Sequence, residues 1–205
     1  YPENLVEFYG DKLQKHIQPG DMEKLKIDSE FLGINYYSDS FIGTPTAEQV
    51  KENKGTFLFP INSDGTPPAP YTDMGWPITP SGLEDLLVRI HQDWPSIPDI
   101  AITENGAAYD DAPDENGQVN DERRVDYLVS HLDAVSRAID NGVPVKAYYY
   151  WSLLDNFEWA EGYVKRFGIV YVNFETLQRI PKLSASVYSK VIKTNGLVLE
   201  EVRKN

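Results

Sequence analysis

Residues 100–106 read Ile-Ala-Ile-Thr-Glu-Asn-Gly, a short apolar run that ends abruptly in a carboxylate, an amide and a glycine. The apolar run predicts a buried β-strand, and Gly106 marks its stop. Glu104 is therefore expected at the carboxyl end of a strand, which is the end that carries the chemistry in barrels of parallel strands. For an isolated glutamate, a solvated carboxylate in a turn would be the simpler interpretation, so the choice depends on the neighbouring segments.

Strands and helices are predicted to alternate on both sides of this segment. The predicted strands are residues 31–37, 100–104 and 145–151, and the predicted helices are residues 81–94, 121–141 and 184–194. Asn120 is expected to cap the middle helix, and Gly142 followed by Pro144 to end it. Three buried strands that alternate with three helices predict parallel βα units and an α/β fold.

The remaining segments add fewer constraints. Residues 2–15 are predicted to be helical, residues 21–27 to form a short helical turn, and residues 167–174 to form a small extra strand. Residues 38–79 form a long connection rich in Gly, Pro and Thr. Such a connection is either a functional loop or a linker between two domains. The alternation of strands and helices resumes after it, which favours the loop.

Residues 151–171 read Trp-Ser-Leu-Leu-Asp-Asn-Phe-Glu-Trp-Ala-Glu-Gly-Tyr-Val-Lys-Arg-Phe-Gly-Ile-Val-Tyr, a dense mixture of aromatic and acidic side chains. A pyranose has apolar faces that pack on an indole, and hydroxyls that donate to carboxylates. The segment therefore favours a sugar site, with an aromatic core at a sheet edge as the alternative. On the strand at residues 31–37, Asn35 and Tyr37 share one face and could hold a carboxylate and a sugar hydroxyl, although tyrosine is common in strands for packing reasons.

Together these motifs resemble glycoside hydrolase family 1, the retaining β-glucosidases and their relatives. The resemblance rests on residues 32–37 (Leu-Gly-Ile-Asn-Tyr-Tyr), 102–106 (Ile-Thr-Glu-Asn-Gly), 151–171 and 74–76 (Met-Gly-Trp), in order and at suitable spacing. It covers nearly the whole chain but only the second half of a family member. The family's Asn-Glu-Pro motif, which carries the acid/base carboxylate, does not occur among these 205 residues.

The fold implied by the resemblance is the C-terminal portion of a TIM (β/α)8 barrel, from about the sixth strand to the eighth. Three units cannot close such a barrel and would leave a sheet edge exposed. Residues 1–205 are thus expected to be part of a single catalytic domain. A complementary N-terminal half of the barrel, as a separate chain or a cleaved partner, is the expected protein partner.

The resemblance also implies roles for individual residues. Glu104 would be the catalytic nucleophile, and Tyr37 would donate a hydrogen bond to it. The residues implied to bind the substrate are Asn35, Trp76, Trp151, Glu158, Trp159 and Phe167. Asp155 and Asn156 are expected to shape the loop that contains them, and no catalytic role is assigned to the neighbouring charged residues of that segment.

The activity implied is hydrolysis of terminal non-reducing β-D-glucosides, including cello-oligosaccharides, as in cellulose degradation. Glu158 favours a neutral sugar, because a carboxylate would repel a 6-phosphate. The alternatives are a 6-phospho-β-glycosidase, a transglycosylase of the same family, and a sugar-binding or interaction fragment without catalysis. The sequence does not distinguish glucose from galactose or fucose.

Composition narrows the range of possible partners and cofactors. The net charge of −13, from 19 basic and 32 acidic residues, argues against a nucleic-acid partner, since phosphate contacts need a basic surface. No apolar run is long enough to cross a bilayer, so no membrane partner is expected. The chain has no cysteine, and its three histidines lack metal-binding spacing, so neither a metal nor another cofactor is expected. The absence of cysteine fits a cytoplasmic enzyme.

Overall fold

The computed structural model describes residues 2–25, 28–40, 48, 51 and 70–196, and the chain divides into two compact units at residue 30. The first unit contains three short helices, α1 (Glu3–Tyr9), α2 (Asp11–Gln14) and α3 (Asp21–Lys24). Gly10 separates α1 from α2 with a φ of +47°, a conformation that suits glycine. Residues 2–15, predicted to be helical, therefore form two short helices instead of one continuous helix. Most of the predicted long connection, including residues 52–69, lies outside the described residues.

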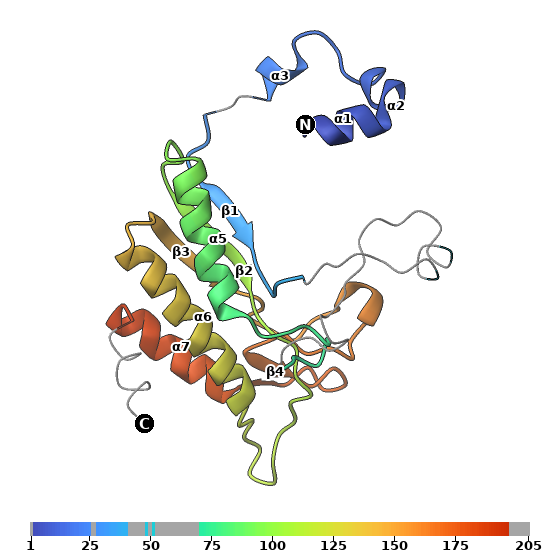
Figure 1. The fold of residues 1–205 in the computed structure, drawn as a ribbon. Coiled ribbons are helices and arrows are strands. Elements are labelled where there is room, and N and C mark those ends of the chain that lie inside the picture. Colours follow the sequence, from blue (N-terminus) through green and yellow to red (C-terminus); the bar gives the residue numbers. More distant parts are fainter. Residues whose placement is uncertain (1, 26–27, 41–47, 49–50, 52–69, 197–205) are drawn as a thin grey trace. The chain divides into compact units, whose positions relative to one another are not determined.

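The second unit is built on a parallel sheet of three strands in the order β1 (Leu32–Asn35), β2 (Ile100–Asn105) and β3 (Val145–Tyr150). Helices α5 (Pro80–Asp93), α6 (Glu122–Asp140) and α7 (Leu183–Thr194) follow the strands in sequence. They lie side by side along one face of this sheet (Figure 1). The predicted alternation of parallel strands and helices is confirmed.

The core lies between the sheet and the helices. Ile100 and Ile102 are completely or almost completely buried, because alternate residues of a strand point to the same face. They pack with Ile34 of β1 and with residues from two helices, namely Leu83, Leu87, Val135 and Ala138. Full burial of one such aliphatic side chain contributes about 1.5–3 kcal/mol, so this layer holds the sheet against the helices.

Both outer strands of the sheet are paired on one side only within the described residues, β1 with β2 and β3 with β2. After β3, a short antiparallel pair follows, β4 (Val170–Val172) and β5 (Arg179–Pro181). The predicted extra strand is thus confirmed as β4, whereas β5 was not predicted.

Helix α6 begins one residue later than predicted. Asp121, and not Asn120, occupies its N-cap position, and the Asp121 carboxylate bonds other partners instead of capping the helix. Among the described helices, none combines the length and the apolarity that crossing a bilayer requires.

Candidate functional site

The candidate nucleophile and its predicted donor meet at the carboxyl ends of adjacent strands. The Tyr37 hydroxyl, just beyond β1, donates a hydrogen bond of 2.6 Å to Oε2 of Glu104 near the end of β2. Parallel pairing makes this possible, because the carboxyl ends of β1 and β2 lie at the same edge of the sheet. Burial raises the pKa of the Tyr37 phenol, and the hydrogen bond and charge of Glu104 raise it further. Tyr37 therefore keeps its proton and acts as the donor.

Whereas Tyr37 bonds Glu104, the side chain of Asn35 bonds the residue before it. Its Oδ1 accepts a hydrogen bond of 2.6 Å from the Thr103 hydroxyl, one residue before Glu104. Asn35 is exposed, whereas Ile34 and Tyr36 on either side of it are buried. The alternation predicted from strand periodicity is therefore present, and Asn35 is placed to order β2 next to Glu104.

Three aromatic rings from distant segments form a cluster at this end of the sheet. Trp76 packs edge-on against Tyr37, with 5.3 Å between ring centroids. Phe167 lies 6.2 Å from the Tyr37 ring and 6.1 Å from the Trp76 ring, and it is only 2% exposed. Two of the predicted substrate-binding residues thus gather around the candidate catalytic tyrosine.

The three remaining predicted substrate-binding residues, Trp151, Glu158 and Trp159, lie in the segment that follows β3. The Trp151 indole Nε1 donates to Oε2 of Glu158 over 3.4 Å. The backbone N–H of Trp151 donates to the carbonyl of Asn105 at 2.9 Å, which joins this segment to the end of β2. Trp159 is 83% exposed, in a short 3-10 turn, η1 (Trp159–Glu161). Its indole is therefore open to a ligand.

Gly106 has a role beyond ending the strand. A Cβ at this position would lie 1.8 Å from the backbone carbonyl oxygen of Trp151. Because the obstacle is backbone, it could not move aside as the end of a flexible side chain would. The absence of a side chain at Gly106 thus allows the segment that contains Trp151 and Glu158 to approach the end of β2.

The segment of Trp76 is anchored to the rest of the site through Asp73. The Asp73 N–H donates to the carbonyl of Ala108 at 3.0 Å, and the Asp73 carboxylate accepts from Arg123 at 3.0 Å. Lys165 Nζ donates to the Asp73 carbonyl at 2.5 Å. Lys165 thus links this segment to the one that follows β3.

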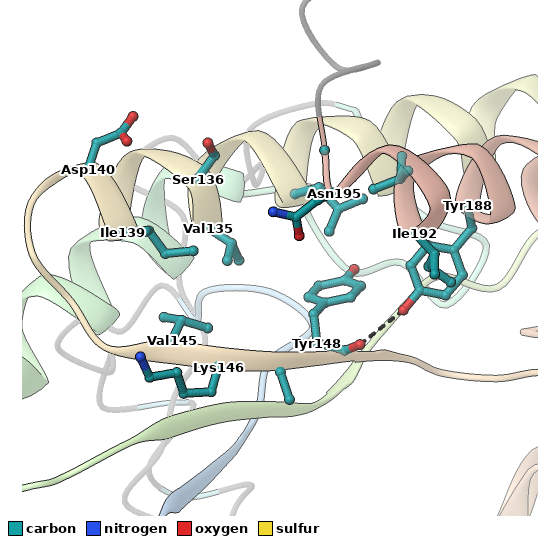
Figure 2. A pocket seen from close by; sticks show the side chains of 14 residues that line it. Val135, Ser136, Ile139, Asp140, Val145, Lys146, Tyr148, Tyr188, Ile192 and Asn195 are labelled. Atoms are coloured by element: carbon teal, nitrogen blue, oxygen red, sulfur yellow. Dashed lines mark hydrogen bonds between the residues drawn. The ribbon is translucent and has the colours of Figure 1, made fainter.

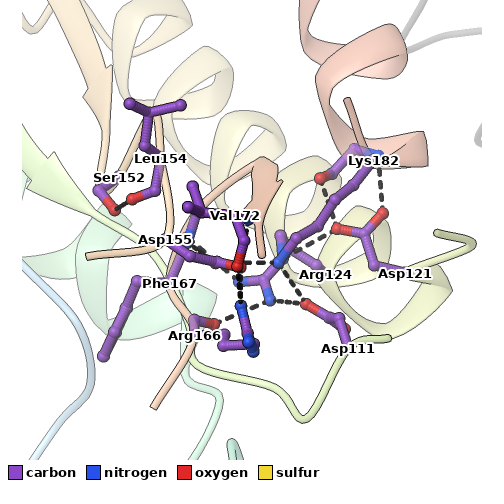
Figure 3. Close-up of polar contacts among 12 residues, drawn as sticks. Asp111, Asp121, Arg124, Ser152, Leu154, Asp155, Arg166, Phe167, Val172 and Lys182 are labelled. Carbon is purple, nitrogen blue, oxygen red and sulfur yellow. Dashed lines mark hydrogen bonds and ion pairs between the residues drawn. The ribbon is translucent and has the colours of Figure 1, made fainter. Parts of the chain in front are cut away.

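Behind the site, six charged side chains form what we call the charge cluster (Figure 3). Its members are Asp111, Asp121, Asp155, Arg124, Arg166 and Lys182, three anions and three cations joined by ion pairs. Burial lowers the pKa of Lys182, and Arg124 lowers it further, whereas Asp111 and Asp155 oppose this change. The cluster balances its formal charges, as buried ions require.

Asp155 uses both carboxylate oxygens to shape the loop after β3. It accepts from the N–H groups of Gly168 at 3.0 Å and Val172 at 3.3 Å, and it pairs with Arg166 at 2.6 Å and Lys182 at 3.2 Å. Asn156 donates to Ser152 Oγ at 2.9 Å and to the carbonyl of Leu154 at 3.1 Å within the same loop. The predicted shaping role of Asp155 and Asn156 is therefore confirmed.

Arg124 connects the loops that follow β2 and β3. Its guanidinium, which is completely buried, donates to the carbonyls of Phe167 at 3.3 Å and Arg166 at 3.0 Å, and also to the carbonyl of Ala107. Its Nε pairs with Asp121 at 2.9 Å. Sequence reasoning missed Arg124, because a basic residue in the first turn of an amphipathic helix is ordinarily solvated.

A metal site is not apparent in this region. Within residues 2–25, 28–40, 48, 51 and 70–196, no three His, Asp or Glu side chains gather in a way that could hold a metal ion. The carboxylates near the site are instead bonded to a phenol, an indole, basic side chains and backbone N–H groups.

Known proteins match this sequence over almost its full length. Residues 1–197 match the family described as "Glycosyl hydrolase family 1". A 1,4-beta-D-glucan glucohydrolase of Thermotoga neapolitana is 43% identical over 201 residues, which cover 96% of this chain and 42% of that protein. A 6-phospho-beta-galactosidase of Clostridium acetobutylicum is 38% identical, over 97% of this chain and 45% of that protein.

A solved structure has the same arrangement of elements. The family 1 β-glucosidase from Thermotoga maritima, in complex with isofagomine lactam, matches with a TM-score of 0.81 and 40% sequence identity. The match covers 96% of this chain and 42% of the solved chain, so the sequence spans less than half the length of its relatives. The family match, the sequence identity and the fold agree with one another, and the chain belongs to glycosyl hydrolase family 1.

Proposed function

We propose that this chain is the C-terminal part of a retaining β-glucosidase, and that β1, β2 and β3 are the sixth to eighth strands of its (β/α)8 barrel. The observation that carries the proposal is the 2.6 Å hydrogen bond from Tyr37 to Glu104 at the carboxyl ends of two parallel strands. Catalytic groups of such barrels lie at that end. Residues 1–205 would then form one part of a single catalytic domain.

A groove beside β3 supports completion of the barrel by the preceding part of the protein. It has a volume of about 650 Å³ and lies between β3 on one side and α6 and α7 on the other (Figure 2). Val135, Ile139 and Val145 contribute apolar surface to it, and Ile139 is 47% exposed. A closed barrel pairs its last strand with its first, so the proposed occupant is the first strand–helix unit.

The proposed reaction proceeds in two displacements at the anomeric carbon. In the first, Glu104 forms a bond to this carbon while the glycosidic C–O bond breaks, and an acid from the preceding part protonates the departing oxygen. In the second, the same acid/base group takes a proton from water, which attacks the anomeric carbon and releases Glu104. Tyr37 stabilises the ionised form of Glu104 by donating a hydrogen bond to it.

The remaining site residues are proposed to bind the sugar. Trp151 would lie under the glycone ring, with Glu158 accepting from the 4- and 6-hydroxyls and Trp159 contacting the 3-hydroxyl. Phe167 would close the side near the 6-position, and Trp76 would lie at the aglycone entrance. The 3.4 Å contact between Trp151 and Glu158 supports this arrangement, because it holds the carboxylate beside the indole.

The proposed substrates are terminal β-D-glucosides, including cello-oligosaccharides. The names of two Thermotoga relatives, a 1,4-beta-D-glucan glucohydrolase and a beta-glucosidase, support this class. The test is to supply an aryl β-glucoside to the complete protein, this chain joined to the preceding part of the barrel. The β-anomer of glucose should appear first by NMR. An α-anomer as first product would exclude the retaining mechanism.

Hydrolysis of 6-phosphoglycosides is a second candidate, because 6-phospho-beta-galactosidases are among the relatives. Glu158 argues against it, since its carboxylate would face the phosphate. Replacing Glu158 with serine should therefore lower kcat/KM for the neutral glucoside by roughly tenfold or more, because an acceptor for sugar hydroxyls is lost. The same substitution should raise the relative kcat/KM for a 6-phosphoglucoside.

The measurement compares both substrates before and after the Glu158→Ser substitution. Glu161, an exposed carboxylate in the same segment, provides the control. Glu161→Ser should leave the ratio of the two kcat/KM values within about twofold. An unchanged ratio in the Glu158→Ser variant would show that Glu158 does not select between the substrates.

The loop that presents Glu158 should depend on the charge cluster for its stability. Asp155→Ala removes one anion, leaves Arg166 without its ion-pair partner and Lys182 with Asp111 alone, and frees two N–H groups. Breaking a buried pair in this way costs about 3–5 kcal/mol. In urea unfolding of the complete protein, Asp155→Ala should therefore unfold at a much lower midpoint than the parent.

Asp93 offers the matched control for Asp155. It pairs with Arg89 at 3.3 Å on the outer surface of α5, where both side chains are solvent-exposed. Asp93→Ala should change stability by less than about 1 kcal/mol, as for most exposed ion pairs. Equal midpoints for Asp155→Ala and Asp93→Ala would contradict a structural role for the charge cluster.

A further inference from the structure

Asn105, the residue that follows the candidate nucleophile, is completely buried. Its Nδ2 donates to the carbonyl of Tyr36 at 2.8 Å and to the Tyr127 hydroxyl at 3.0 Å. Its Oδ1 accepts from the Tyr148 hydroxyl at 2.6 Å. Asn105 therefore joins the end of β2 to the chain beyond β1, to β3 and to α6, next to Glu104 in the sequence.

Tyr127 extends this network to the backbone of the candidate catalytic tyrosine. Its hydroxyl, which accepts from Asn105, donates to the carbonyl of Tyr37 at 2.9 Å. The Tyr37 side chain in turn donates to Glu104 at 2.6 Å. Two hydrogen bonds thus connect Asn105, through Tyr127, to the main chain of Tyr37, and the side chain of the same Tyr37 bonds the carboxylate of Glu104.

The Tyr127 ring is fixed independently of its hydroxyl. It stacks on His131, one turn further along α6, with 3.9 Å between centroids and 23° between planes. Nδ1 of His131 donates to the carbonyl of Tyr127 at 2.8 Å. Removing only the hydroxyl should therefore leave the ring in place, so the effect of the hydrogen bond to Tyr37 can be measured separately from packing.

The hydrogen bond between the main chains of Tyr36 and Glu104 shows why support of the main chain by Asn105 and Tyr127 matters. The Tyr36 N–H donates to the carbonyl of Glu104 at 2.9 Å, and Tyr37 is the next residue. The Asn105 and Tyr127 side chains then bond the two successive carbonyls of Tyr36 and Tyr37. A hydrogen bond weakens steeply when its geometry changes, so movement of this main chain would weaken the contact of Tyr37 with Glu104.

We propose that Asn105 and Tyr127 are positioning residues, which hold the main chain at Tyr36 and Tyr37 so that the Tyr37 phenol stays on the Glu104 carboxylate. The inference rests on the proposed function, in which Glu104 is the nucleophile. Neither residue touches the reacting atoms in this scheme. Both act through Tyr37.

The surrounding ionisable groups allow a pH profile to report on this role. Those that face the network are Tyr36, Tyr37, Tyr109, Tyr127, Tyr148, Tyr150 and His131. Burial raises the pKa of each of these tyrosines and lowers the pKa of His131 to about 4. The negative charge of the Glu158 carboxylate also raises the pKa of Tyr37. Between about pH 5 and 9 the tyrosines and His131 stay neutral, so the acidic limb reports on the carboxylates.

The test is Tyr127→Phe in the complete protein, with kcat/KM for an aryl β-glucoside measured against pH. A carboxylate that loses part of a hydrogen bond takes up a proton at higher pH. The acidic limb should therefore move to higher pH, with kcat about tenfold lower and KM within about twofold. A fall in the amount of folded enzyme would scale the profile without moving the limb, so the shift remains measurable if the variant folds poorly.

Tyr188→Phe is the matched control, because the Tyr188 hydroxyl donates at 2.9 Å to a main-chain carbonyl of β3, that of Tyr148, and not to the main chain at Tyr36 or Tyr37. It should leave the limb in place. In the double variant with Tyr37→Phe, adding Tyr127→Phe should cause no further shift, because Tyr127 acts through Tyr37. A shift from Tyr37→Phe with none from Tyr127→Phe, or additive shifts, would overturn this inference alone. If the parent is active and Tyr37→Phe leaves the acidic limb of its pH profile unchanged, both the proposed role of the Tyr37–Glu104 pair and this inference are wrong.

Discussion

Replacing Glu104 with glycine in the complete protein should lower the hydrolysis of β-glucosides by a factor of roughly 10⁴ or more, as loss of a nucleophile does in other enzymes. Without the carboxylate, no covalent glycosyl intermediate can form. Added azide should restore turnover, because it fits the space left by the side chain and attacks the anomeric carbon as the aglycone departs. One displacement inverts that carbon, so the product should be the α-glycosyl azide.

Three further experiments make the test of Glu104 specific. Glu104→Gln should be equally inactive but should not be rescued, because the amide fills the space that azide needs. Glu161→Gln, which changes an exposed carboxylate in the segment after β3, should keep nearly full activity. A mechanism-based 2-fluoroglycoside should label Glu104 in the parent, and a peptide labelled at another residue would refute the assignment.

The second large effect concerns the chain produced alone. Residues 1–205 should neither hydrolyse β-glucosides nor fold cooperatively, because they lack an Asn-Glu-Pro carboxylate and β1 and β3 are each paired on one side only in the described structure. Unpaired sheet edges and exposed apolar surface favour association. We expect the isolated chain to be insoluble, loosely folded or self-associated.

Co-expression with a segment that supplies the first five strands should restore a compact, active particle. Size-exclusion chromatography, urea unfolding and a glucosidase assay on the same preparation would measure this. The control is co-expression with an unrelated soluble domain, which should rescue neither folding nor activity. A soluble monomer of 23.3 kDa that unfolds cooperatively and hydrolyses glucosides by itself would contradict the proposed architecture.

Sequence periodicity predicted the elements that hold the site better than it predicted the contacts between them. Apolar runs and helical spacing located β1, β2, β3, α5, α6 and α7, because those patterns record which side faces the core. Glu104 and Tyr37 could be paired in advance through their strand-end positions and the family resemblance. The two-residue error at the end of β1 is small, since Tyr36 and Tyr37 continue its direction past the last ladder residue.

The features that sequence reasoning missed depend on long-range partners. Nothing local distinguishes Arg124 or Lys182 from a solvated cation, and their burial becomes evident only when the loops after β2 and β3 fold over them. Asn105 was read as part of a strand stop, although its side chain joins three elements. β5 has three residues, too few for a periodic signal, and it exists through pairing with β4.

The charge cluster has a consequence for the exchange of loops between relatives. Asp155 and Arg166 of the loop after β3 pair with each other, but Asp155 also pairs with Lys182 at the start of α7. Arg124 of α6 donates to the Arg166 carbonyl, and both Arg124 and Lys182 pair with Asp111 of the loop after β2. In a relative that received residues 151–168 alone, Asp155 and Arg166 would face the recipient's own residues at positions 111, 124 and 182. The sugar-facing loop is therefore not a transferable module by itself, and Asp111, Arg124 and Lys182 have to be transplanted with it.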